Sequence, residues 1–137
     1  MKRNVLVVIA LALFLLANCT FVDHTSPDSL TVLVGKDHPL PKDYEPEDLV
    51  VPNVRFPFTE DDPKKQLRKE AAEALEQLFD AAEEEGHFLL AQSGYRSFER
   101  QEAIFASNVE QDGEEAANQY SARPGESEHQ TGLVMDI

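Results

Sequence analysis

One amphipathic segment constrains the fold of this chain more than any other. Residues 62–86 read DPKKQLRKEAAEALEQLFDAAEEEG, in which Asp62 can cap a helix, Pro63 suits its first position and Gly86 can end it. Apolar residues recur at spacings of three and four: Leu67, Ala71, Ala74, Leu75, Leu78, Phe79 and Ala82. This spacing predicts one long helix with a buried apolar stripe. A chain of 137 residues is long enough for a single domain, whose core would cover that stripe.

Shorter elements are predicted on both sides of this helix. HFLLAQ reads as a strand, FERQEAIFASNVEQDG as a helix capped by Ser97, and EEAANQYSA as a second short helix. RPGESEHQTG reads as a loop and LVMDI, at 133–137, as a strand. The proline-rich stretch 20–63 is interpreted as an extended segment laid against the domain, with a short strand at 33–34.

The N-terminus has the composition of an export signal. A basic start at Lys2 and Arg3 precedes an apolar run at 5–17, which is shorter than a membrane span of about 20 residues. LANC resembles a bacterial lipobox, so Cys19 is the expected lipidation site, with residues 1–19 as the signal peptide or lipoprotein signal. An uncleaved N-terminal anchor and a buried free thiol are the alternatives. The protein is expected to be exported, to the outer face of a bacterial membrane or to the cell wall.

The charge of the chain excludes some partners. Its formal net charge is −14, and such a surface repels nucleic acid, so no nucleic-acid partner is expected. Cys19 is the only cysteine, so no intrachain disulfide can form.

The terminal stretch SEHQTGLVMDI places His129 and Asp136 on either side of a Thr-Gly pair. A continuous strand would separate their Cα atoms by about 23 Å and a helix by about 10 Å, whereas ligands of one metal ion lie closer together. A chain reversal at Gly132 would bring both side chains to one ion. Asp136 also interrupts an apolar run, where a buried carboxylate needs a partner. Spacing alone leaves the alternative that both side chains are simply solvated.

Two motifs together resemble a known family. SGYRSFERQ, followed by ARPGESEHQTGLVMDI, resembles the VanY-type D-alanyl-D-alanine carboxypeptidases, zinc metallopeptidases that trim peptidoglycan stem peptides, and VGKDHPLPKDYEPEDLV resembles their lead-in. The resemblance implies an α+β fold, with helices packed on a small antiparallel sheet as in Hedgehog/DD-peptidase-like domains. It divides the chain into the signal, a linker at 20–32, and a partial carboxypeptidase domain at 33–137.

The resemblance also implies roles for particular residues. His129 and Asp136 would bind Zn²⁺, Arg96 would face the substrate and steady the oxyanion, and Gln101 and Ser127 would contact a stem peptide ending in D-Ala-D-Ala. Without the family, Arg96 reads equally well as an ion-pair partner and Gln101 as helix surface. The implied reaction is hydrolysis in which the metal activates water and a glutamate takes the proton.

Part of the family pattern has no counterpart in this sequence. The third zinc ligand and the general base belong to an ExxWH-like segment downstream of the aspartate, and the other histidines, His24, His38 and His87, lie upstream. The chain is therefore expected to be the N-terminal part of the enzyme domain and inactive alone. L,D-carboxypeptidase or endopeptidase specificity is a variant of this hypothesis. A noncatalytic peptidoglycan-binding lipoprotein and an inactive remnant are the alternatives.

Overall fold

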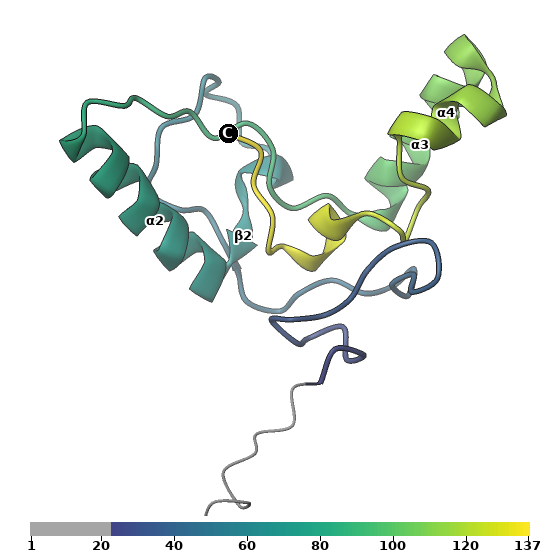
Figure 1. Cartoon of the computed structure of the whole chain (residues 1–137), viewed down its shortest axis with the longest axis horizontal. Helices are drawn as coiled ribbons and strands as arrows, with labels where there is room; N and C mark the ends of the chain where they lie inside the picture. Colours follow the sequence, from purple (N-terminus) through teal and green to yellow (C-terminus); the bar gives the residue numbers. More distant parts are fainter. Residues whose placement is uncertain (1–22) are drawn as a thin grey trace, which may run out of the picture.

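The computed structural model describes residues 23–137, and its arrangement is α+β as predicted (Figure 1). Strands β1 (Leu49–Val50) and β2 (Leu67–Arg68) form a two-stranded antiparallel sheet, with Leu49 opposite Arg68 and Val50 opposite Leu67. Helix α2 (Lys69–Glu84) lies at one side of the molecule. Helices α3 (Phe98–Asp112) and α4 (Glu114–Tyr120) lie at the other, with extended segments and two 3-10 helices between them.

The main core lies where α2 meets the sheet. Its buried members are Leu67, Ala72, Leu75, Phe79 and Ala91, and partly buried apolar side chains from α2 and from the extended segments pack against them. Leu67 is 2% exposed and Ala91 is fully buried, so packing against α2 fixes both strand β2 and residue 91. Ala91 directly precedes residues 92–96, so the core fixes the chain where that segment begins.

The prediction of one helix over 62–86 is wrong in its first part. Asp62 does act as a cap, since its side chain accepts from the Lys64 N–H, but it caps only the 3-10 helix η1 (Pro63–Lys65). The chain then turns extended into β2 before α2 begins. The physical cause is tertiary: the N–H of Arg68 donates to the Gly132 carbonyl at 2.8 Å, a bond that a continuous helix would not permit. The predicted stripe is also only partly buried, because Ala74 is exposed and Leu78 is 49% exposed.

The three strands predicted from the sequence are also not formed. Residues 33–34, 87–92 and 133–137 are extended but make only isolated bridges or single hydrogen bonds, among them the antiparallel bridge between Ser93 and Asp136. The helix predictions at α3 and α4 are confirmed, and Ser97 caps α3 by accepting from the Arg100 N–H. The predicted loop before Gly132 contains the 3-10 helix η2 (Glu128–Thr131).

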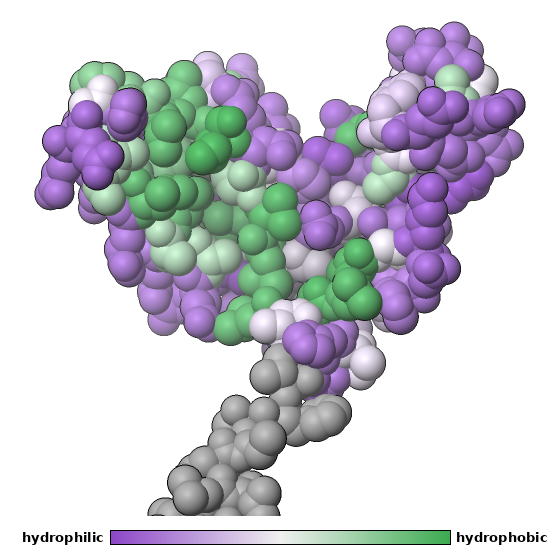
Figure 2. Space-filling view, viewed as in Figure 1, coloured by the Kyte–Doolittle hydropathy of each residue, from purple (hydrophilic) through white to green (hydrophobic). Residues whose placement is uncertain are grey.

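Apolar surface remains open beside α2 (Figure 2). Large apolar side chains exposed within residues 23–137 include Phe88 at 74%, Val51 at 52% and Leu78 at 49%. Within the same residues, none of the helices combines the length and the apolar character that a membrane crossing requires. Cys19 and the apolar run before it lie outside the described residues.

Candidate functional site

The candidate site is built on residues 92–96, which connect two distant parts of the chain. On one side the N–H groups of Gly94 and Tyr95 donate to the carbonyls of residues 64 and 66, at 2.6 and 2.8 Å. On the other side the Arg96 N–H donates to the His129 carbonyl at 3.1 Å, and residues 92 and 93 exchange hydrogen bonds with the Asp136 backbone at 2.7 and 2.9 Å. These backbone bonds bring the two motifs of the sequence together.

The predicted chain reversal is confirmed, and it places His129 beside Asp136. Helix η2 ends at Gly132, whose φ of 67° lies in the left-handed region that glycine adopts without strain. His129 Nε2 then lies 3.6 Å from Asp136 Oδ2. The two groups are therefore close enough to share one cation.

The imidazole of His129 is held in one orientation. Its Nδ1 lies 2.8 Å from the Gly94 carbonyl oxygen, and because a carbonyl can only accept, Nδ1 must carry the hydrogen. In the neutral ring this leaves the Nε2 lone pair facing Asp136. A backbone carbonyl holding the far nitrogen of a ligating histidine is a common arrangement in metal sites.

This donor pair fits zinc. Ligands about 2.0–2.2 Å from a tetrahedral ion lie about 3.4 Å apart, close to the 3.6 Å between Nε2 and Oδ2, which is too long for a good hydrogen bond. Among residues 23–137, however, no group of three His, Cys, Asp or Glu side chains could hold a metal ion. The expectation that Asp136 is buried is wrong, since its side chain is 56% exposed. The case for a metal therefore rests on geometry.

Arg96, two residues before α3 begins, reaches the same region. Its guanidinium donates to Gln101 Oε1 at 2.9 Å and to the Ser93 hydroxyl at 3.2 Å. Burial lowers the pKa of Arg96 below its ordinary value, the nearby carboxylate of Asp136 opposes this, and the positive charge of Arg100 adds to it. The guanidinium still stays charged, so it presents a fixed cation beside the His129–Asp136 pair.

Gln101 and Ser127 are both buried, at 3% and 5% exposure. Both ends of the Gln101 amide are held inside the protein, because its Oε1 accepts from Arg96 and its Nε2 donates to the Ala122 carbonyl at 2.6 Å. Ser127 directly precedes η2. In this structure Gln101 orients Arg96, and contact of Gln101 or Ser127 with a peptide stays a prediction.

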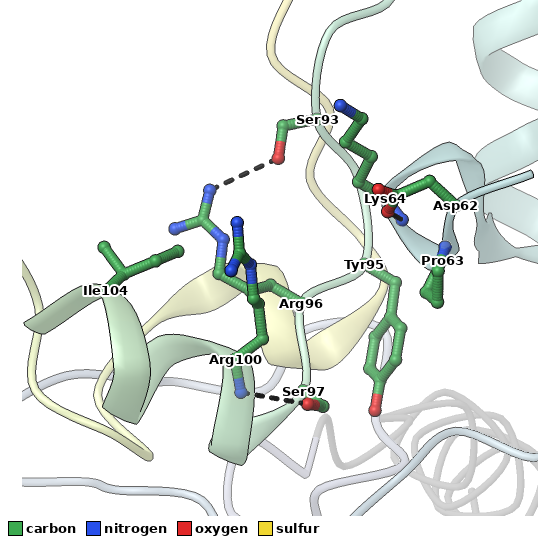
Figure 3. A pocket seen from close by; sticks show the side chains of 9 residues that line it. All are labelled: Asp62, Pro63, Lys64, Ser93, Tyr95, Arg96, Ser97, Arg100 and Ile104. Carbon is green, nitrogen blue, oxygen red and sulfur yellow. Dashed lines mark hydrogen bonds between the residues drawn. The ribbon is translucent and has the colours of Figure 1, made fainter. Parts of the chain in front are cut away.

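A cavity of about 550 Å³ opens beside Arg96 (Figure 3). It is lined by Asp62, Pro63, Lys64, Ser93, Tyr95, Arg96, Ser97, Arg100 and Ile104. The sequence reasoning missed Gly94, Ser93, Lys64 and Arg100. The first two stand inside the SGYRS motif that was already singled out, so their position next to Arg96 was a usable signal. Lys64 and Arg100 carried no such signal.

Comparison with known proteins identifies the family of this chain. The family model described as VanY, D-alanyl-D-alanine carboxypeptidase, matches residues 64–137. YodJ of Bacillus subtilis (strain 168), which is named provisionally as a carboxypeptidase, is 54% identical over 112 residues, covering 82% of this chain and 41% of YodJ. The chain spans about half or less of the length of the curated relatives it matches.

Two solved structures show the same fold. The LdcB LD-carboxypeptidase aligns with a TM-score of 0.77 and 54% identity, over 80% of this chain and 51% of that one. A variant of the vancomycin-resistance D,D-pentapeptidase VanY, in complex with Zn(II), aligns with a TM-score of 0.61 and 30% identity, over 81% of this chain and 61% of that one. The chain belongs to the VanY family of D-alanyl-D-alanine carboxypeptidases.

Proposed function

We propose that these residues form part of a zinc-dependent carboxypeptidase that removes the terminal residue from peptidoglycan stem peptides. The observation that carries this proposal is the pairing of His129, held at Nδ1 by the Gly94 carbonyl, with Asp136 at 3.6 Å. The relative solved with Zn(II) supports the choice of metal. The family match and this donor pair favour catalysis over a noncatalytic binding role.

The residues of this chain would divide the work. His129 Nε2 and Asp136 Oδ2 would hold the metal, which when bound supplies Lewis-acid activation of water and of the scissile carbonyl. Arg96 would donate to the carbonyl oxygen as negative charge develops there, and Gln101 keeps its guanidinium aligned. We assign the role of general base to no residue within 23–137.

The bond that is cleaved has two candidates. The family description favours cleavage between two D-configured residues, as in a stem peptide ending in D-Ala-D-Ala. The LdcB LD-carboxypeptidase, however, is 54% identical to this chain, whereas the D,D-pentapeptidase is 30% identical. Cleavage between an L-configured residue and a terminal D-residue is therefore the second candidate.

A hybrid enzyme tests the proposal. Residues 33–137 would replace the matching part of YodJ, and the hybrid would be assayed on one peptide ending in D-Ala-D-Ala and one ending in a single D-Ala. We expect turnover that a chelator abolishes and zinc restores, and the preferred peptide assigns the bond. The 137-residue chain alone is expected to show no turnover. A folded hybrid that cleaves neither peptide, while intact YodJ cleaves one, would contradict the function.

We also propose that the protein is exported and attached to the membrane through Cys19. The support is in the sequence, where a basic start and an apolar run precede LANC. In cells fed a labelled fatty acid, we expect label in the protein and none in the Cys19→Ser variant. Equal labelling of both would contradict lipidation at Cys19.

A further inference from the structure

The cavity beside Arg96 holds two arginines, Arg96 and Arg100, that have no carboxylate partner among residues 23–137. Among residues 23–137, Arg55, Arg68 and Arg123 each form an ion pair, with N–O distances of 2.7, 2.8 and 2.6 Å. Arg96 and Arg100 have no carboxylate in ion-pair range within these residues, and both line the cavity. In a chain of net charge −14, this pairing deficit at one place indicates a site for an anion from outside.

The two guanidinium groups differ in what already binds them. Arg96 donates to Gln101 and to the Ser93 hydroxyl, so part of its donor fork is used. The side chain of Arg100 has no hydrogen-bond partner within the described residues, and only its backbone N–H is engaged, with Ser97. Figure 3 shows both guanidinium groups on the same side of the cavity. The donors of Arg100 are therefore available to a ligand.

The remaining lining determines what kind of anion fits. Lys64 adds a third cation, with its Nζ 3.8 Å from the centre of the Phe58 ring. The one acidic lining residue, Asp62, accepts a hydrogen bond from the Lys64 backbone at 2.9 Å. Pro63 and Ile104 supply apolar wall. A volume of about 550 Å³ exceeds what one carboxylate needs and is within the range of small-molecule sites.

We propose that Arg100, together with Arg96, binds an acidic side chain of the substrate peptide. The carboxylate would lie between the two guanidinium groups and its methylene groups against Ile104 and Pro63. The inference rests on the proposed function, because the cavity adjoins the zinc ligands through Ser93, which pairs with Asp136. Arg100 would then be a specificity-determining residue that selects peptides with a carboxylate side chain near the scissile bond.

Two peptides that differ in one group test this inference. One carries the acidic side chain and the other carries its uncharged amide, and calorimetry measures the dissociation constant of each for the 137-residue chain. We expect the chain to bind the acidic peptide about tenfold more tightly, as expected for hydrogen bonds to a charged group. Arg100→Gln should abolish this preference, and the matched control Arg55→Gln, which removes an equal charge from an exposed ion pair, should retain it.

The outcomes separate this inference from the proposed function. Equal affinity of the chain for both peptides, binding of neither, or an Arg100→Gln effect on both alike would overturn the role of Arg100. Turnover is measured separately in the hybrid. Hydrolysis of both peptides with equal KM would support the carboxypeptidase function and overturn the selectivity. Acid-selective binding that Arg100→Gln abolishes, in a hybrid without turnover, would support the selectivity and count against the function.

Discussion

Replacement of His129 by alanine is expected to remove zinc binding by the hybrid enzyme described above. The imidazole supplies one of the two donors that the described residues bring together, 3.6 Å apart, and Asp136 alone is a partly exposed carboxylate. Loss of outer partners of a metal ligand typically lowers affinity about 10–100-fold, so loss of the ligand itself should lower it by at least about 100-fold. Zinc titration of the metal-free hybrid enzyme, followed by calorimetry, measures this, because the described residues of this chain bring together only two of the ligands. In the hybrid enzyme, turnover should fall to background.

His87→Ala is the matched control, because His87 is exposed, follows the end of α2 and belongs to no described cluster of metal-binding side chains. In the hybrid enzyme we expect the zinc affinity of this control to equal that of the unmodified hybrid. If His129→Ala binds zinc as tightly as the control, the metal is held elsewhere and the pairing with Asp136 has another purpose. Thermal unfolding of both variants without zinc shows whether either change disturbs the fold.

The local elements of this fold could be predicted from the sequence. Helix α3 is set by its Ser97 cap and ends at Gly113, which has a positive φ, and both signals lie within the segment itself. The reversal at Gly132 was predictable for the same reason. The start of α2 was not predictable, because backbone groups of residues 66–68 form hydrogen bonds with partners far away in the chain, including Gly132. Such pairings leave no trace in local spacing.

The candidate site was predictable in its ligands and not in its surroundings. His129 and Asp136 stand in a motif, and turn geometry brings them together. The exposure of Asp136 was misjudged, because an apolar run was interpreted as a buried strand although it forms only one bridge, with Ser93. Arg100 resembled any charged residue on a helix surface. The ion pairs of Arg55, Arg68 and Arg123 make the difference visible, because Arg100 has no such partner among residues 23–137.

Replacement of Gly94 by alanine is expected to damage both the fold and the proposed zinc site. An added Cβ would press on the Gln66 carbonyl oxygen and lie 2.8 Å from Met135 Cε, and 3.2 Å from the Lys64 carbonyl oxygen. These carbonyls accept hydrogen bonds from the 92–96 segment itself, so the backbone cannot move away without breaking them. Overpacking of this kind costs about 1–3 kcal/mol. Denaturant unfolding should show that loss in the free energy of unfolding.

The same substitution should weaken zinc binding, because the Gly94 carbonyl fixes the imidazole of His129 at Nδ1. A shift of that carbonyl frees the ring to rotate, so we expect zinc affinity about 10–100-fold lower at a temperature where the variant is still folded. Gly35→Ala is the control, since an added Cβ there meets nothing within 4 Å and φ is not positive. Unchanged stability and affinity in Gly94→Ala would mean that the 92–96 segment does not hold the two motifs together. Lower stability with unchanged zinc affinity would support the packing argument, but it would exclude a role for the Gly94 carbonyl in orienting His129.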